Sequence, residues 1–175
     1  MATGGWPQIP GGLDCPGSLT SNEALSLSEL PKSLLVQGGG YIAVELCGIF
    51  NKLGVEVTQV IRAERILRGF DEDVRAHLGR EMTKKGIKIV TGVTISEVSE
   101  KSGTYSVQLS DGQALQADEL LFATGRLPNT GDLGLERVGV DLAENGAIKV
   151  DKWSRTSCSN IYAIGDCTDR LNLTP

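Results

Sequence analysis

The first half of the chain alternates between two spacings of apolar residues, and each change of spacing predicts a change of secondary structure. Residues 33–37 form a short apolar run between a proline and glycines, which is typical of a buried parallel strand. From Tyr41 the apolar positions recur at helical spacing until Gly54, a natural helix stop. Residues 55–61 predict a second strand. Together these segments form a strand, glycine turn, helix and strand unit of about 30 residues.

A second helix follows and leads into another strand. Acidic residues at 71–73 favour a helix start because they complement the helix dipole. Val74, Leu78 and Met82 are spaced by four and are expected to form its apolar stripe, and Gly86 is expected to end it. The third strand is predicted over residues 87–90.

The rest of the chain has the pattern of strands and hairpins. Between residues 93 and 117, apolar and polar residues alternate on both sides of an Asp-Gly dipeptide at 111–112, a good hairpin signal. Further strands are expected over residues 119–125, 147–151 and 160–166. The fold class predicted is α/β, with a parallel sheet and a three-stranded antiparallel meander.

Composition narrows the class of protein without fixing its function. The chain has 175 residues, 40% hydrophobic and 22% charged, which is ordinary for a globular protein of one domain or a little more. Its net charge of −5 argues against a nucleic-acid surface, and no apolar run approaches the ~20 residues of a membrane span. The single histidine, His77, lies inside a predicted helix and is interpreted as a surface or packing residue. Both ends of the chain have the character of a segment cut from something longer.

The cysteines give no sign of a metal site or a redox pair. None of Cys15, Cys47, Cys158 and Cys167 stands in a C-x-x-C or other metal-ligand spacing. We expect reduced, partly buried thiols of an intracellular protein and no bound metal.

The glycine turn carries the strongest chemical signal. In G-x-G-x-x-[GA], the first glycine makes a tight turn, the second lets a diphosphate approach the backbone, and the last small residue lets helix and strand pack closely. Gly38, Gly40 and Ala43 occupy those places, after a predicted strand and at the start of a predicted helix. The motif therefore predicts a Rossmann-like nucleotide-binding domain, with a dinucleotide held at a helix N-terminus.

The residues after the second strand favour NADPH over NADH. An NAD site places an acid there to bind the ribose hydroxyls, whereas this position is near Ile61 and is not acidic. Arg62 and Arg68 instead offer two guanidinium groups to a 2′-phosphate. Glu64 lies between them and is expected to pair with Arg65. A solvated charged loop is the alternative.

Several longer stretches resemble the glutathione reductase branch of the pyridine nucleotide-disulfide oxidoreductase family. The stretches are GGGYIAVE, IRAERILRGFD, LLFATGRLPNT, TSCSNIYAIGDCTDRLNLTP and ATGGWPQIPG, and they cover nearly the whole chain. The resemblance implies the NADPH-binding portion of an FAD-dependent glutathione-disulfide reductase, in which NADPH reduces FAD, a redox disulfide and then oxidised glutathione. It also implies a homodimeric parent in the cytoplasm, or in the chloroplast if it is plant-type, that binds neither nucleic acid nor membranes.

The resemblance assigns a role to particular residues. The glycine turn and Ile42 would contact NADPH, Tyr41 would cover the nicotinamide pocket, and Glu45 would pair with a lysine beside the flavin. Plain packing for Tyr41 and a solvent-facing position for Glu45 are the alternatives, and a simple turn is the alternative for Asp166. The full set of cofactor-binding residues that the resemblance implies is Gly38, Gly39, Gly40, Tyr41, Ile42, Glu45, Arg62 and Arg68, with Gly125 and Arg126 in the NADPH cleft and Asp166 and Thr174 at the FAD.

The chain also departs from the family pattern. It lacks the C-x-x-x-x-C redox pair, the first FAD-binding glycine turn, the lysine expected beside Glu45 and the C-terminal dimer domain, so no catalytic residue is assigned. Gln37 replaces the apolar residue usual at the end of the first strand. The expected division is a crossover segment at 1–23, an NADPH-binding domain at 24–147 and a partial FAD-domain segment at 148–175.

Two other readings remain open at this point. The chain could belong to a mercuric, trypanothione or dihydrolipoamide type of disulfide oxidoreductase, although the non-acidic Ile61 disfavours the last of these. It could also be a nucleotide-binding module without turnover.

Overall fold

The computed structural model describes residues 1–170 and 172, which form two compact units. One unit is Pro7–Gly125, and the other combines Met1–Trp6 with Arg126–Pro175. The nucleotide-binding domain expected at 24–147 overlaps mainly the first of these units, and the expected three-part division stays a prediction.

A four-stranded parallel sheet forms the centre of the unit Pro7–Gly125. The strand order is β4-β3-β2-β8, and all three neighbouring pairs are parallel. The fold class predicted from the sequence, α/β with a parallel sheet, is confirmed. The strands are β2 (Ser33–Gln37), β3 (Glu56–Ile61), β4 (Lys88–Thr91) and β8 (Glu119–Phe122).

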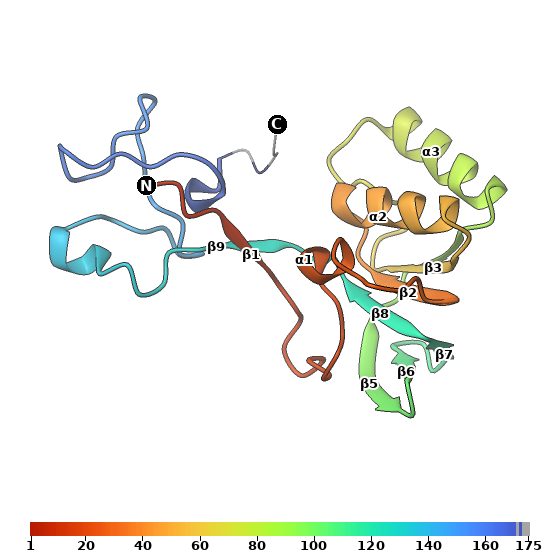
Figure 1. Ribbon diagram of the computed structural model, residues 1–175. Coiled ribbons are helices and arrows are strands. Elements are labelled where there is room, and N and C mark those ends of the chain that lie inside the picture. The colour runs from red at the N-terminus through yellow and green to blue at the C-terminus, as the bar shows by residue number, and fades with distance from the viewer. Residues whose placement is uncertain (171, 173–175) are drawn as a thin grey trace. The chain divides into compact units, whose positions relative to one another are not determined.

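Two helices cover one face of this sheet, α2 (Tyr41–Lys52) and α3 (Glu72–Lys84) (Figure 1). The helix α2 buries Ala43, Leu46, Cys47 and Phe50, which recur at helical spacing and pack on β2 and β3. The start of α3 is capped by Asp71, whose carboxylate accepts the N–H groups of Asp73 and Val74, as the acidic run predicted. The predicted stripe of α3 is wrong at its first position: Met82 is buried, but Val74 is 50% exposed.

An antiparallel meander covers the opposite face of the sheet (Figure 1). Successive residues of a strand point to opposite faces, so Leu34 and Val36 of β2 join the core beneath the helices, whereas Leu35 joins the core beneath the meander. The meander follows the predicted order. Its strands are β5 (Ile95–Lys101), β6 (Thr104–Leu109) and β7 (Ala114–Ala117).

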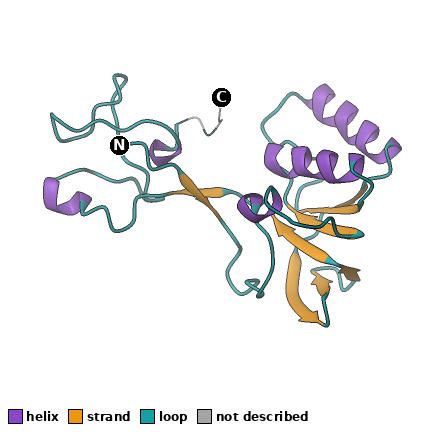
Figure 2. Ribbon diagram, in the orientation of Figure 1, coloured by secondary structure: helices purple, strands orange, loops and turns teal. Residues whose placement is uncertain are grey.

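The other unit has little regular structure (Figure 2). Its core is small and consists of Leu135, Val140, Ile148, Ala163 and Cys167. The strands predicted over 147–151 and 160–166 are wrong. Each segment forms one isolated bridge, Leu142 with Ile148 and Arg155 with Tyr162, because no extended strand runs beside either one in the described part of the chain.

The remaining elements are short. The strands β1 (Gly5–Pro7) and β9 (Arg126–Pro128) pair in a two-stranded sheet, and α1 (Ser21–Ala24) begins at Thr20 with a capping box. Two 3₁₀ turns are η1 (Leu135–Val138) and η2 (Asp166–Thr168). Within the described residues, no helix is long and apolar enough to cross a membrane.

Candidate nucleotide-binding site

The three glycines form the turn from β2 into α2, at the carboxyl edge of the parallel sheet. From β2 the chain passes to β3 on one side of it, and β8 later takes the place on the other side. This is a topological switch point, where open α/β sheets bind their ligands. The sequence motif and the topology therefore indicate the same edge of the sheet.

Gly38 is required by the fold itself. Its φ is +144°, a backbone conformation that favours glycine, and a Cβ there would overlap the carbonyl group of Ala123 after β8, at 2.7 Å from the carbonyl carbon. The Gly38 N–H donates to Val60 O at 3.0 Å. The first glycine of the motif thus lets the turn pass between β3 and β8.

Gly40, in contrast, is required by nothing in the described part of the chain. It is exposed, its φ of −79° and ψ of 177° are open to any residue, and a Cβ there would meet no atom within 4 Å. Ala43, the third small position, is fully buried where α2 packs on the sheet. The fold itself requires small residues at Gly38 and Ala43. At Gly40 it does not, so the glycine there is explained by a ligand that approaches the backbone.

The hydrogen bonds of the turn occupy its three carbonyls and leave several of its N–H groups without an acceptor. The carbonyls of Gly38, Gly39 and Gly40 accept from Gln59 Nε2 at 2.8 Å, Leu67 N at 2.6 Å and Val44 N at 3.1 Å. The N–H groups of Gly39, Gly40 and Ile42 have no acceptor among residues 1–170 and 172, and no side chain caps α2. Unpaired N–H groups and the positive end of the helix dipole suit an anion, and the residues present therefore fit a diphosphate.

The loop after β3 is held against this turn. Leu67, in left-handed conformation at φ 54°, donates its N–H to Gly39 O, and a Cβ on Gly39 would lie 3.3 Å from Ile61 Cγ2. Arg62 directly follows Ile61, and Arg68 directly follows Leu67. The two arginines predicted from the sequence thus flank residues that contact the glycine turn.

Both predicted arginines are exposed and unpaired. Neither Arg62 nor Arg68 makes an ion pair or side-chain hydrogen bond within the part of the chain that the structure describes. The expected pairing of Glu64 with Arg65 is wrong, because Arg65 pairs with Glu72 at 2.9 Å. Glu72, the first residue of α3, lies nearer to the Arg65 guanidinium than Glu64 does, so it forms the ion pair expected of Glu64.

Arg75 fixes the shape of this loop and was missed in the sequence analysis. Its Nε donates to Ile66 O at 2.8 Å, its Nη2 donates to Arg65 O at 3.3 Å, and its Nη1 pairs with Glu72. Its side chain is only 12% exposed. The only sequence signal was a charged residue beside the predicted apolar stripe of α3, which does not indicate a backbone partner.

The other predicted residues of this unit lie around the turn with less distinctive surroundings. Tyr41 and Ile42 are half-buried against the core beneath the helices. Glu45 is exposed on the next turn of α2, and no described residue pairs with it. Gly125 follows β8, has a φ of +137°, and its carbonyl accepts the N–H of Gln8 at 2.9 Å. Their predicted roles stay predictions.

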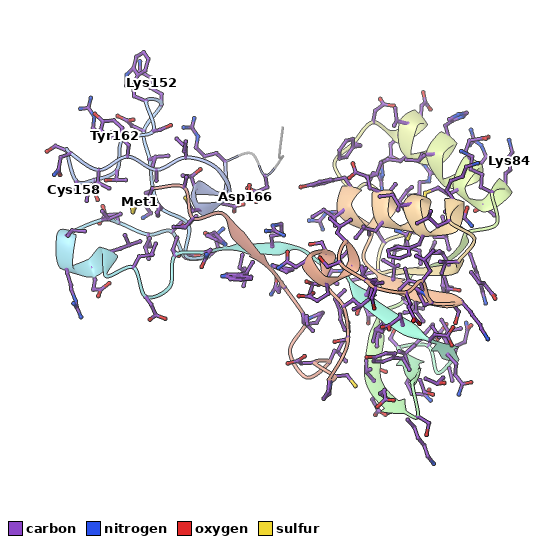
Figure 3. The ribbon with its side chains drawn as sticks, in the orientation of Figure 1. Met1, Lys84, Lys152, Cys158, Tyr162 and Asp166 are labelled. Atoms are coloured by element: carbon purple, nitrogen blue, oxygen red, sulfur yellow. The ribbon has the colours of Figure 1, made fainter. Side chains whose placement is uncertain are left out.

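Asp166 and Thr174 are the two residues predicted for FAD. Asp166, labelled in Figure 3, lies on η2, and its Oδ2 is 3.5 Å from Nε of Arg126, which also donates to Gly5 O. Within residues 1–170 and 172, only α2 and α3 are long enough to offer a helix N-terminus to a diphosphate. The N-terminus of α3 is already capped by Asp71. Thr174 lies outside the described residues. Their predicted roles at the FAD stay predictions.

Gln37 is buried at the end of β2, and its Oε1 has no hydrogen-bond partner among the described residues. An unpaired buried amide oxygen costs roughly 1–3 kcal/mol of folding free energy. The polar residue that the sequence analysis noted in place of an apolar one therefore destabilises the fold.

A cavity of about 550 Å³ lies between α3 and the outer edge of the sheet. It is lined by Ile61, Ile66 and Ile89 and by basic residues of α3, but by none of the three turn glycines, Arg62 or Arg68. Because it lies on the α3 side of the loop, we treat it as separate from the candidate site.

Cys47 is expected to resist alkylation in the folded chain. It is fully buried under α2, and burial raises the pKa of its thiol to about 12. At pH 8 only about 10⁻⁴ of such a thiol is ionised, and the thiolate is the reactive form. Iodoacetamide treatment followed by mass spectrometry should label the half-buried Cys15 and Cys158 first, and Cys47 only in denaturant. Equal labelling of Cys47 and Cys158 in the native state would contradict this burial.

The comparisons with known proteins agree with this geometry. A family model described as pyridine nucleotide-disulphide oxidoreductase matches residues 1–175. A glutathione reductase from Burkholderia cepacia is 50% identical over 175 residues, covering 100% of this chain and 39% of that protein. A trypanothione reductase from Trypanosoma congolense is 46% identical over 182 residues, covering 100% of this chain and 36% of that protein.

Solved structures give the same picture. The HOCl-induced flavoprotein disulfide reductase RclA from Escherichia coli superimposes with a TM-score of 0.91 at 33% identity, over 98% of this chain and 40% of that one. The chain thus spans about two fifths of the length of the relatives it matches.

Proposed function

The chain belongs to the pyridine nucleotide-disulphide oxidoreductase family, and on that premise we propose that it is the NADPH-binding portion of an FAD-dependent glutathione-disulfide reductase. The nucleotide part of the proposal rests on the glycine turn. Its three carbonyls are all paired inside the protein, and its N–H groups at Gly39, Gly40 and Ile42 have no acceptor among the described residues. Gly40 has open space where a side chain would otherwise stand. A diphosphate fills both requirements at once.

The choice of NADPH rests on the loop beside the turn. Arg62 and Arg68 are exposed, without a partner in the described residues, and adjacent to residues that contact Gly39. A 2′-phosphate on the adenosine supplies the negative charge that two guanidinium groups can bind through charge-assisted hydrogen bonds. Arg75 contributes indirectly, because it holds the carbonyls of Arg65 and Ile66 and so keeps the loop in place.

In this proposal the described residues bind the coenzyme and distinguish NADPH from NADH, and they do not carry out the chemical step. NADPH, when bound, supplies a hydride. The turn orients the diphosphate, and the arginines select the phosphorylated adenosine. We assign no described residue to the chemical step, since the four cysteines are free thiols and Cys47 and Cys167 are buried. In this proposal FAD and the redox disulfide belong to the complete reductase, and so does the binding of oxidised glutathione.

Glutathione is proposed as the substrate from sequence similarity, with glutathione reductases at 50%, 42% and 44% identity over the whole chain. Trypanothione and mercuric reductases at 46% and 38% identity share the same segment, and nothing in the described site separates their disulfide or metal substrates. The choice of glutathione therefore rests on sequence similarity alone, whereas nucleotide binding can be measured directly on this chain.

Titration of the chain with NADPH and with NADH, followed by nicotinamide fluorescence, tests the nucleotide part. We expect NADPH to bind at least about tenfold more tightly, because a single additional charge-assisted bond contributes roughly 1.5–3 kcal/mol. Raising the salt concentration should narrow the difference, since the arginines are exposed. Equal affinities would remove the role of Arg62 and Arg68, and binding of neither coenzyme would refute the site.

A further inference from the structure

Gln59 stands out as a buried polar side chain in an apolar environment. It lies on β3 with 0% exposure, and its same-face neighbours on the strand, Val57 and Ile61, belong to the core beneath the helices. Its Oε1 has no hydrogen-bond partner among the described residues. A methionine or leucine would fill the same space without burying an unpaired oxygen, so packing does not explain the amide.

Among the described residues, the side chain of Gln59 makes a single hydrogen bond, and it is made to the glycine turn. Its Nε2 donates to the carbonyl of Gly38 at 2.8 Å. The carbonyls of Gly39 and Gly40 accept backbone N–H groups, those of Leu67 and Val44, which the fold supplies whatever the side chains are. Of these three carbonyls, only that of Gly38 accepts its hydrogen bond from a side chain among the described residues.

That hydrogen bond also decides the direction of an N–H group. The peptide unit between Gly38 and Gly39 is planar and trans, so its C=O and its N–H point in opposite directions. With the carbonyl held toward Gln59 in the core, the Gly39 N–H is directed away from it, and it is one of the unpaired donors of the turn. Glycines resist rotation of a peptide less than other residues do, and a rotated peptide would present a carbonyl oxygen to the ligand.

We propose that Gln59 is a positioning residue for the dinucleotide diphosphate: it locks the 38–39 peptide so that the Gly39 N–H, and not the Gly38 carbonyl, faces the phosphates. This role rests on the proposed nucleotide site and deepens it. Both NADPH and NADH carry the diphosphate, so the residue acts on overall affinity and not on the choice between them.

The replacement Gln59→Met keeps the size of the side chain and removes the donor. In fluorescence titrations of the 175-residue chain, we expect the affinities for NADPH and NADH to fall together by about tenfold or more, with their ratio unchanged. The matched control is Val57→Ala, which truncates a core residue on the same strand and face. It should lower stability in urea while leaving both affinities within about twofold of the wild type, because Val57 pairs with Leu34, four residues before the turn.

Amide hydrogen exchange reports on the peptide itself. NADPH should protect the Gly39 and Ile42 amides of the wild type, and in Gln59→Met it should still protect Ile42 but no longer Gly39. Unchanged affinity of Gln59→Met, or retained protection of Gly39, overturns the proposal. If the wild type binds neither coenzyme, the proposed function fails and this role fails with it. If both wild type and variant bind normally, only the role of Gln59 fails.

A second variant keeps the test decisive if Gln59→Met is poorly folded. In Gln59→Glu a protonated carboxyl can donate to the Gly38 carbonyl, and an ionised one cannot. Burial raises the pKa of such a carboxyl above its ordinary value, so the variant should bind NADP⁺ at pH 5 and lose affinity as the pH rises to 8. Wild-type affinity measured over the same range provides the reference. A Gln59→Glu profile parallel to that of the wild type overturns the proposal.

Discussion

Replacing Gly38 with alanine is expected to prevent stable folding, whereas the same replacement at Gly40 should leave the fold intact and abolish dinucleotide binding. The two glycines are separated by one residue and belong to one motif. They differ in what surrounds them: protein backbone at Gly38 and open space at Gly40. Within this one sequence motif, Gly38 is therefore required for folding and Gly40 for binding the ligand.

At Gly38 the cost has two sources. A φ of +144° strains any residue with a Cβ by roughly 1–3 kcal/mol, and the overlap with Ala123 forces a backbone shift of similar cost. Ala123 cannot yield easily, because its N–H donates to Gln37 O at 2.8 Å. A total of roughly 2–6 kcal/mol is a large part of the 5–15 kcal/mol that stabilises an ordinary domain.

At Gly40 the backbone already has a conformation that alanine accepts, and the Cβ meets no atom within 4 Å. Exchanging glycine for alanine at a helix N-cap costs under about 1 kcal/mol. The added methyl group would occupy the space that the diphosphate needs. We therefore expect nearly unchanged stability and a loss of affinity of about a hundredfold or more, the result of blocking two or more N–H contacts.

Urea denaturation and NADPH titration of both variants check these expectations together. Gly54→Ala serves as a control for Gly38, since Gly54 has a positive φ of 92° but open space around its Cβ, and it isolates backbone strain from overlap. A Gly38→Ala chain as stable as Gly54→Ala would contradict the overlap with Ala123. Wild-type affinity in Gly40→Ala would show that no phosphate approaches that residue.

The sequence predicted the parts of the fold that depend on short-range order. The strand at 33–37 has the predicted bounds, and the helix that begins at Tyr41 starts where the spacing changed. Glycine and aspartate mark these boundaries through local geometry, as at Asp71, so no tertiary contact is needed to locate them. The meander could also be predicted from the sequence, because each hairpin joins strands that are neighbours in the sequence.

What the sequence did not predict depends on which partners each residue meets in the folded chain. The segments at 147–151 and 160–166 have the composition of strands, yet a strand exists only beside another strand, and each segment finds a single bridging residue. Gln59 and Arg75 escaped notice for a similar reason. Their roles come from hydrogen bonds to backbone carbonyls at Gly38, Arg65 and Ile66, which residue type and spacing do not reveal.

Replacing both Arg62 and Arg68 with glutamine is expected to reduce NADPH affinity by about 10²–10⁴-fold and to leave NADH affinity nearly unchanged. Each lost charge-assisted bond to the 2′-phosphate is worth roughly 1.5–3 kcal/mol, and NADH has no such phosphate to lose. Folding should be little affected, because both side chains are exposed and have no partner among the described residues. Fluorescence titration of the double variant with both coenzymes measures the change in preference directly.

The matched control removes the same charge elsewhere. Arg80 on α3 is exposed and unpaired in the described structure, and Arg137 on η1 is exposed and only 3.8 Å from Glu136, so Arg80→Gln with Arg137→Gln alters the net charge equally. Neither residue flanks the glycine turn in the sequence, and exposed charges are screened at 0.1 M salt, so this control should shift both affinities by less than about threefold. An equal loss of NADPH affinity in the control would mean general attraction by a basic surface, whereas a loss confined to the Arg62 and Arg68 variant identifies those two guanidinium groups as the contacts that distinguish NADPH from NADH.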